Sequence, residues 1–168
     1  MIISGGEFMI DDEVIRQQLI ALLRGGNAHL NFERAVSQFP FDYINRKASH
    51  VSYSPWELLE HMRICQWDIL EFIRNPQYES PPWPKGYWPA KEEFADEKKW
   101  QKTLSDFSKN LLSVEKLVND PSINLYQPIP HAPDYNIFRE ILLIADHNAY
   151  HLGELVVLRK TLSIWPYS

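Results

Sequence analysis

The sequence predicts an all-α fold, arranged as a bundle of four helices. Three observations lead to this prediction. Apolar residues recur with a helical period in four separate stretches of the 168-residue chain. Irregular connections, rich in proline or polar residues, separate these stretches. No segment shows strand-like alternation of useful length. Helices packed against one another are therefore favoured over a fold that contains a sheet.

The composition is typical of one globular domain, with 45% hydrophobic and 23% charged residues. We expect residues 1–10 to form a flexible N-terminal extension, with translation starting at Met1 or Met9, and residues 11–168 to form a single domain. The net charge is −5, and lysine and arginine are scattered along the chain. This pattern argues against nucleic acid as a partner.

The chain lacks an apolar window long enough for a membrane span and a start typical of a secretion signal. Cys65 is its single cysteine, so an intramolecular disulfide is excluded. We therefore expect a cytoplasmic protein with no membrane partner. Cys65 is interpreted as a buried structural thiol in preference to a reactive one.

The first helical stretch runs from Asp11 or Asp12 to about Gln38, and Gly25-Gly26 interrupts it. Two glycines within a helix cost about 2 kcal/mol relative to alanine, so they indicate a kink or a close approach of another backbone. His29 follows one turn later and is an alternative metal ligand if it faces the centre. The apolar positions of this stretch are Ile15, Leu19, Leu22, Leu23, Leu30 and Val36.

The second helix is predicted to begin at Ser54-Pro55-Trp56-Glu57 and to end near Arg74. Serine as the N-cap, proline at the first helical position and glutamate three residues after the serine form a capping box. Its apolar stripe consists of Leu58, His61, Met62, Cys65, Ile69 and Phe72. His61 is therefore expected to point into the interior.

Residues 75–91 carry five prolines and four aromatic residues, so they form neither helix nor sheet interior. We predict a crossover or a lid over residues 76–90, held down by Trp83, Tyr87 and Trp88.

A third helix is expected from about Glu93 to Val118, with a solvated face formed by Lys98, Lys102, Asp106 and Lys109. Its apolar stripe consists of Phe94, Trp100, Leu104, Phe107, Leu111, Val114 and Val118.

A linker follows the third helix, and His131 in it is interpreted as a surface residue. Either Asp134 or Asn136 can cap the fourth helix, which ends near Ser163. The stripe predicted for this helix consists of Leu143, His147, His151, Leu155 and Leu158.

His147 and His151 are four residues apart, so their imidazoles lie one turn apart on the same helical face. This spacing allows two neutral imidazoles to bind one divalent ion. His61 is the best third ligand, because burying three imidazoles without partners would be costly and a shared ion satisfies all of them. The sequence therefore predicts a metal site of three histidines.

Three protein ligands leave one position open, which is the arrangement of a catalytic site. An ion held there lowers the pKa of a bound water or thiol and so generates a nucleophile. The carboxylates of Glu57, Asp146 and Glu154 are candidates for orienting the ligands, although each could equally be a solvated charge.

Other metal and catalytic motifs are excluded by spacing. A di-iron carboxylate site needs an acidic residue three positions before a histidine, and none of the six histidines has one. Asn148 follows His147 where a zinc protease would carry its catalytic glutamate. A phosphate-binding glycine loop and a G-x-S-x-G motif are also absent from the sequence.

Three stretches, SPWELLEHMRICQWDILEFI, WPKGYWP and ADHNAYHLGELVVLRK, resemble the DinB-like (DinB/YfiT-like) superfamily of bacterial helical metalloproteins. The resemblance covers about residues 12–163. It implies a four-helix bundle with an up-down-down-up path, often a homodimer, that binds nickel or zinc through histidines matching His61, His147 and His151. Characterised members of that family include metal-dependent thiol S-transferases and an isomerase that use low-molecular-weight thiols.

We therefore expect a divalent-metal-binding protein that acts as a hydrolase or thiol S-transferase on a small electrophilic substrate. A non-catalytic, damage-inducible metal-binding protein is the alternative. A helical interaction module with a histidine-rich core is the third interpretation.

Overall fold

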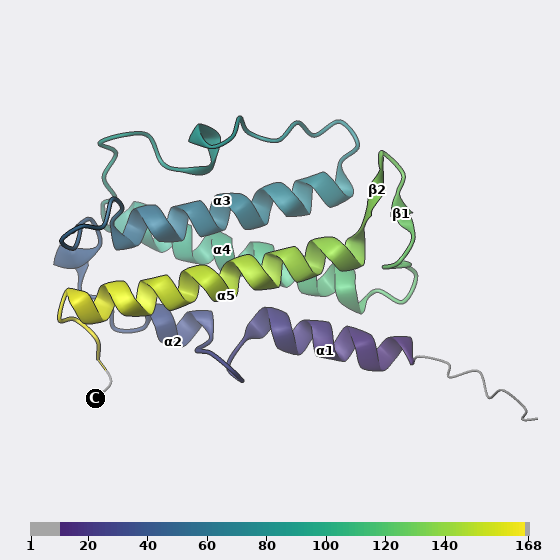
Figure 1. Ribbon diagram of the computed structural model, residues 1–168, viewed down its shortest axis with the longest axis horizontal. Coiled ribbons are helices and arrows are strands. Elements are labelled where there is room, and N and C mark those ends of the chain that lie inside the picture. Colours follow the sequence, from purple (N-terminus) through teal and green to yellow (C-terminus); the bar gives the residue numbers. More distant parts are fainter. Residues whose placement is uncertain (1–10, 167–168) are drawn as a thin grey trace, which may run out of the picture.

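The computed structural model describes residues 11–166, and these residues are mostly helical (Figure 1). The predicted extension at residues 1–10, with its two candidate start methionines, lies outside the described residues. The helices are α1 (Asp12–Arg24), α2 (Phe32–Val36), α3 (Pro55–Arg74), α4 (Glu97–Asn119) and α5 (Ile137–Thr161), with 3-10 turns at Phe41–Tyr43 and Lys85–Tyr87. Within the described part of the chain, no helix is both long and apolar enough to cross a bilayer.

A short hairpin corrects the expectation that the chain has no sheet. Strand β1 (Pro128–Ile129) pairs antiparallel with β2 (Ala132–Asn136), and the buried Ile129 faces Ala132 in the pairing register. The first strand has two residues, which is too short for alternation of polar and apolar residues to show in the sequence.

The four longer helices pack along one another (Figure 1). Both α1 and α3 contact α4 and α5. Helices α3 and α4 run in one direction, and α1 and α5 run in the other. Because α3 and α4 are parallel, residues 75–96 must return along the length of α3, about 30 Å for a 20-residue helix. The crossover predicted for this stretch is confirmed.

The first helical stretch is divided in two at its glycines. Gly25 and Gly26 have φ angles of 65° and 89°, in the left-handed region that favours glycine. A Cβ atom at Gly25 would lie 2.7 Å from Cε1 of His29. The His29 ring instead packs at this break, with its Nδ1 2.8 Å from the carbonyl oxygen of Leu30. His29 therefore does not join the other candidate ligands, which corrects that alternative.

The predicted capping box opens α3. The amide of Glu57 donates to Oγ of Ser54 over 3.2 Å, and the amide of Ser54 donates to Oε2 of Glu57 over 2.6 Å. At the start of α5, Asn136 is the cap, because its side chain accepts from the amide of Arg139. The sequence allowed either Asp134 or Asn136 as the cap of this helix, and in the structure Asn136 is the cap.

Three predicted apolar stripes need correction. In α1, Leu22 is 48% exposed. Helix α4 begins at Glu97, because the Asp96 side chain caps it by accepting from the amide of Lys99, and Phe94 is 66% exposed before it. In α5, Leu143 is 38% exposed. The buried face of α5 consists of Glu140, Ile141, Ile144, Ala145, Asn148, Leu152, Leu155, Leu158 and Arg159.

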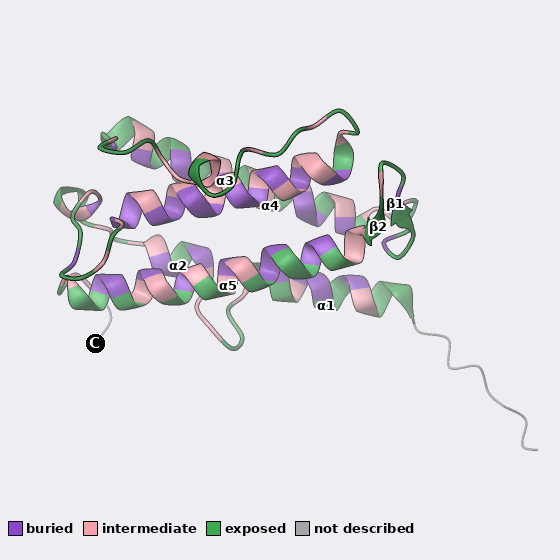
Figure 2. Cartoon of the chain, turned by 45° about the horizontal axis from the view of Figure 1, so that its top comes forward, coloured by how far each residue is buried: buried purple, intermediate pink, exposed green. Residues whose placement is uncertain are grey.

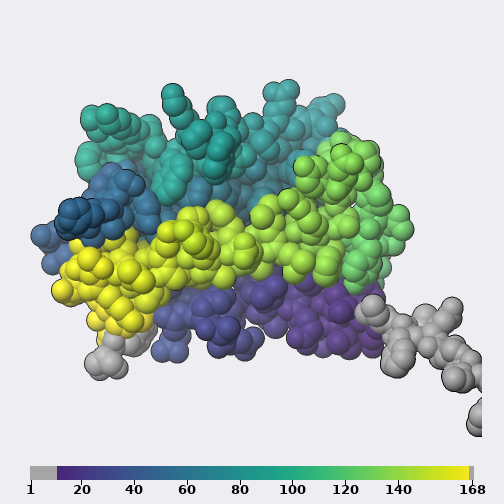
Figure 3. Space-filling view, in the orientation of Figure 1, coloured from purple at the N-terminus to yellow at the C-terminus, as the bar shows by residue number. Residues whose placement is uncertain are grey.

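The core lies where the buried faces of the helices meet (Figure 2). One apolar cluster surrounds Trp56, Phe107 and Leu155, and a second contains Leu19 and Ile141. In α5 the two histidines follow Asp146 and Tyr150, which are exposed, and precede Asn148 and Leu152, which are buried. They therefore lie at the edge of the core. Figure 3 shows α5 at the surface along one face of the molecule, between the crossover side and α1.

Candidate metal centre

Three histidines from two helices converge beneath the crossover segment. His61 comes from α3, and His147 and His151 come from α5. One ring nitrogen from each lies within 4.8 Å of the others, and they form the one group of this kind within residues 11–166. His61 is 3% exposed, whereas the two α5 histidines are of intermediate exposure. The sequence prediction that these residues meet is confirmed.

A backbone carbonyl fixes the orientation of His61. Its Nδ1 lies 2.7 Å from the carbonyl oxygen of Tyr87 in the crossover segment. A carbonyl oxygen accepts hydrogen bonds only, so Nδ1 of His61 carries the proton and Nε2 keeps its lone pair. That Nε2 faces Nε2 of His147 at 3.3 Å. His61 is therefore held in the tautomer that a metal ligand needs.

A carboxylate orients His151 in the same way. Nδ1 of His151 lies 2.6 Å from Oε2 of Glu154, one turn further along α5. An ionised carboxylate accepts only, so the lone pair of His151 is on Nε2. Metal-ligating histidines usually donate their second ring N–H to a carboxylate or a backbone carbonyl. His61 and His151 each make one of these two contacts.

The distance between the first two nitrogens suits a shared ion. Two imidazole nitrogens bound to one tetrahedral ion at 2.0–2.1 Å are about 3.4 Å apart. The observed separation between Nε2 of His61 and Nε2 of His147 is 3.3 Å. A hydrogen bond from His147 to His61 also fits this distance. It would account for two rings only, and it would leave the convergence of His151 unexplained.

Burial favours the neutral form of His61 and His147. Desolvation lowers the pKa of His61, and the hydrogen bond to the Tyr87 carbonyl only partly opposes this effect. Desolvation lowers the pKa of His147 to about 3, assisted by repulsion from His151 and His61. An imidazolium group repels a divalent ion and must lose a proton before it can bind the ion. A neutral imidazole does neither. The cluster is thus suited to metal binding at neutral pH.

An aromatic side chain of the crossover covers His61. The ring of Trp88 stacks on the His61 ring with centroids 4.1 Å apart and planes inclined by 2°, and Tyr53 stacks against Trp88 at 5.6 Å. These contacts confirm that Trp88 holds this segment down, and a hydrogen bond from the Tyr87 hydroxyl to Asp68 confirms the same for Tyr87. Trp83 is 76% exposed, which corrects its predicted role.

The buried Asp68 of α3 fastens the crossover segment at two points. Its Oδ1 accepts from the Tyr78 hydroxyl and its Oδ2 from the Tyr87 hydroxyl, each over 2.9 Å. Burial and the hydrogen bond to Asp68 raise the pKa of Tyr87 to about 12, so the hydroxyl remains a donor. Because Tyr87 also supplies the carbonyl that orients His61, Asp68 indirectly positions that histidine. Sequence reasoning missed Asp68.

The three carboxylates proposed to orient the ligands lie in different environments. Glu154 contacts His151, as described above. The Glu57 carboxylate is part of the capping box, and its Oε2 also lies 3.0 Å from the ammonium group of Lys47. Asp146 is exposed on α5. A contact with the cluster is thus observed for Glu154.

The remaining candidates behave as structural or surface residues. Cys65 is buried, with its Sγ 3.5 Å from Nδ1 of His61. Desolvation and the nearby Asp68 raise the pKa of this thiol to about 12, so it is protonated at neutral pH. His131 is exposed, and its Nε2 lies 2.7 Å from the Phe72 carbonyl oxygen. Both interpretations made from the sequence are confirmed.

The fold and site together describe a helical protein with three convergent histidines under an aromatic crossover. Comparisons of the chain with protein-family models, with curated proteins and with solved structures give no match. The function is therefore inferred from the geometry of the cluster and from the residues around it.

Proposed function

We propose that His61, His147 and His151 bind a divalent metal ion, zinc or nickel, and that the protein is a metal-dependent enzyme acting on a small electrophile. The reaction class is hydrolysis or transfer to a low-molecular-weight thiol. One observation carries the proposal: three rings converge, and acceptors on Nδ1 place the lone pairs of His61 and His151 on Nε2.

The donor set supports this assignment. Imidazole nitrogen is a suitable ligand for both zinc and nickel. Three protein ligands leave a position for water or substrate, as in catalytic zinc sites. When bound, the ion supplies Lewis acidity, which lowers the pKa of a water or thiol in that position toward neutrality.

The surrounding residues have separate tasks in this proposal. The Tyr87 carbonyl and the Glu154 carboxylate keep the rings of His61 and His151 in their ligand orientation. Trp88 excludes water from the face of His61 on which it stacks. Glu154 is only partly buried, so its carboxylate is also placed to accept a proton released at the site.

We further propose that the chain is a DinB-like protein. The directions of the four longer helices agree with the up-down-down-up path that the resemblance implies. The position of His61 on α3, and of His147 and His151 on α5, also agrees with this resemblance. A homodimer and a low-molecular-weight thiol as cosubstrate are further predictions from it.

The test is metal analysis by mass spectrometry on the purified protein, followed by activity assays. We expect about one ion per chain in the wild type and substantially less in His147→Ala. His131→Ala, which removes an exposed histidine outside the cluster, should retain the ion. Turnover should be measured with p-nitrophenyl acetate for hydrolysis, and with 1-chloro-2,4-dinitrobenzene plus a panel of thiols for transfer.

The results separate the interpretations. Turnover that disappears on chelation and returns with zinc or nickel supports the enzyme. A stoichiometric ion without turnover in any assay supports the non-catalytic alternative. Undiminished metal content in His147→Ala would show that the ion is bound elsewhere, and the proposed centre would be wrong.

A further inference from the structure

The crossover segment, residues 75–96, is fixed at its two ends. At its start, the amide of Asn75 donates over 2.9 Å to a carbonyl oxygen of α3. Near its end, the side chain of Asn45 makes hydrogen bonds of 2.8 and 2.9 Å with the backbone of Ala95. None of residues 75–94 is buried. A segment with few buried apolar contacts belongs to the less stable part of a fold, so its position depends on a small number of specific contacts.

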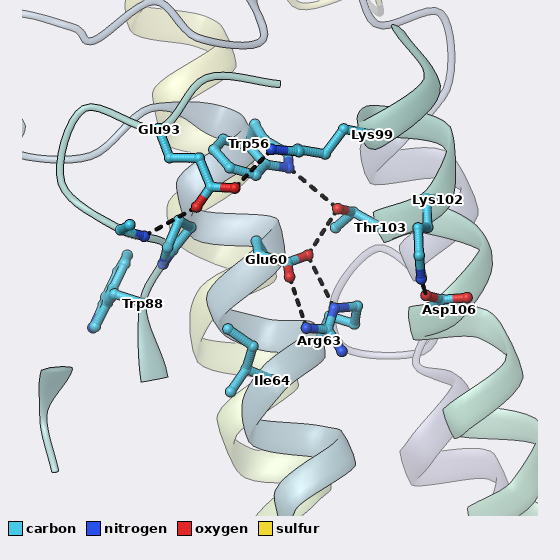
Figure 4. Close-up of a pocket in the computed structure, with 12 residues that line it drawn as sticks. Trp56, Glu60, Arg63, Ile64, Trp88, Glu93, Lys99, Lys102, Thr103 and Asp106 are labelled. Carbon is cyan, nitrogen blue, oxygen red and sulfur yellow. Dashed lines mark hydrogen bonds and ion pairs between the residues drawn. The ribbon is translucent and has the colours of Figure 1, made fainter. Parts of the chain in front are cut away.

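The later part of the segment crosses a cavity between α3 and α4 (Figure 4). The cavity has a volume of about 460 Å³, and Trp88, Pro89, Ala90 and Glu93 line one side of it. We call it the α3/α4 cavity. Oε1 of Glu93 lies 2.6 Å from the ammonium group of Lys99, and the two side chains are 37% and 41% exposed. Solvent screens an exposed ion pair, so this contact resists lifting of the segment only weakly.

One carboxylate of α3 holds the middle of the segment. Asp68 accepts from the hydroxyl groups of Tyr78 and Tyr87, each over 2.9 Å. The two tyrosines lie on either side of the exposed Trp83 in the chain. Hydrogen bonds to an ionised acceptor are among the stronger ones in proteins. Because both tyrosines share one acceptor, release from Asp68 frees the segment on both sides of Trp83.

The same stretch also touches the His61 imidazole at two points. The Tyr87 carbonyl oxygen lies 2.7 Å from Nδ1 of His61, and the Trp88 ring stacks on the imidazole with centroids 4.1 Å apart. Both contacts exist only while the segment lies on α3. They involve the imidazole ring itself, so a change in the charge of this ring changes their strength.

Sharing of the His61 Nε2 lone pair with a cation makes the ring more positive. Its Nδ1–H then becomes a stronger donor to the Tyr87 carbonyl, because charge-assisted hydrogen bonds are about twice as strong as neutral ones. A positive ring over the face of an indole is also favourable. The closed segment therefore gains more from a loaded site than from an empty one. By linkage, the closed segment raises metal affinity by the same factor.

We propose that the crossover segment is a hinged cover for the metal centre, that Asp68 is its latch, and that metal held by the three histidines favours the closed position. This inference rests on the metal binding in the proposed function and adds a means of regulating that site. In the open position, the face of His61 that Trp88 covers is accessible from solvent.

Trypsin cleavage measures opening of the cover. Lys85 is exposed within the cover and precedes Gly86, and a protease cleaves such a bond through the transiently opened state. Saturating zinc or nickel should slow cleavage after Lys85 about tenfold, within the roughly 5–150-fold range of coupling between sites. Cleavage after Arg24, which is exposed and precedes Gly25, is the internal control and should keep its rate. Mass spectrometry gives both rates, and metal content is measured on the same samples.

Three variants test the latch and its link to the metal. Tyr78→Phe removes one hydroxyl from Asp68 and should speed metal-free cleavage after Lys85 about tenfold, the effect of one hydrogen bond to a charged group. Tyr135→Phe, which changes an exposed tyrosine of β2, is the matched control and should keep the wild-type rate. His147→Ala should keep the metal-free rate and lose the response to metal. Circular dichroism confirms that each variant is folded.

The measured metal content separates the possible failures. A bound ion with unchanged cleavage after Lys85, or with equal slowing after Arg24, would overturn the coupling and leave the metal centre standing. Absence of bound zinc and nickel would overturn both proposals. A wild-type cleavage rate in metal-free Tyr78→Phe would show that Asp68 is not the latch.

Discussion

The two sides of α3 differ in how their polar groups are satisfied. On the α5 side, three imidazoles face one another, and burial lowers the pKa of two of them, His61 and His147. On the α4 side, three cations and three carboxylates form ion pairs within the protein. The same crossover segment covers both sides, and Trp88 contacts both.

This difference separates a candidate binding site from a cavity whose charges are already paired. In the histidine cluster the lone pairs of His61 and His151 lie on Nε2, which suits them to bind a divalent cation. In the α3/α4 cavity each cation is paired with a carboxylate of the protein. Metal binding should consequently have a large effect on stability, and disruption of the ion pairs should have a small effect.

The largest expected effect is stabilisation by metal. An ion that binds only the native state at a thousandfold excess over its Kd stabilises by about 4 kcal/mol. For a chain of this size that corresponds to a rise in Tm of roughly 10 °C. Thermal unfolding with and without added zinc or nickel measures it. The rise should vanish in His61→Ala and persist in His131→Ala, and an equal rise in both variants would contradict the site.

The next effect is pH dependence of the metal-free protein. The native pKa of His147 lies near 3, well below its ordinary value near 6.5, so the unfolded chain binds more protons between these values. Stability is therefore greatest above pH 6.5 and falls as the pH decreases toward 3. The slope is at most about 1.4 kcal/mol per pH unit for one proton.

Carboxylates titrate in the same range, so the wild type must be compared with His147→Gln. A glutamine side chain cannot take up a proton in this range, and the free energy of unfolding of that variant should change less steeply between pH 6.5 and 4. Chemical denaturation of chelator-treated samples gives both curves. Parallel curves would show that His147 does not titrate abnormally in the native state.

A third effect concerns the residue that orients His151. Replacement of Glu154 by glutamine removes the charged acceptor of the Nδ1 proton, and such changes typically weaken metal affinity 10–100-fold. Competition with a chromogenic chelator measures the affinity. Asp146→Asn, an exposed carboxylate on the same helix, is the matched control and should leave the affinity within about twofold of wild type. Equal losses in both variants would indicate a general charge effect.

The contrast between Glu57 and Glu154 shows what the sequence could predict. Both carboxylates lie about one helical turn from a candidate ligand, so spacing alone treats them alike. The structure distinguishes the two carboxylates, because Glu57 accepts a hydrogen bond from the Ser54 amide and forms an ion pair with Lys47. Glu154 accepts from His151, and the hydroxyl groups of Tyr53 and Tyr150 also interact with its carboxylate. To choose Glu154 over Glu57 from the sequence, one would have to know which hydrogen bonds each carboxylate forms.

The convergence of the three histidines was predictable because helical spacing is regular. His147 and His151 share a face by arithmetic, and the apolar neighbours of His61 indicated burial. The positions of His147 and His151 relative to the core were less predictable, since these residues lie beside the buried face of α5 and not within it. Trp88 and the Tyr87 carbonyl escaped specific assignment, because an irregular segment has no period and a backbone acceptor leaves no sequence signature.

The smallest expected effect lies in the α3/α4 cavity. Lys102 pairs with Asp106 across one helical turn, and its side chain is 72% exposed. Exposed pairs of this kind contribute about 0.3–0.5 kcal/mol, because solvent screens the charges and ordering two side chains costs entropy. Lys102→Gln should therefore lower the free energy of unfolding by no more than about 0.5 kcal/mol. Urea denaturation measures the change. A loss near 2 kcal/mol would mean that the ion pairs hold α4 in place, and the proposed contrast between the two sides of α3 would fail.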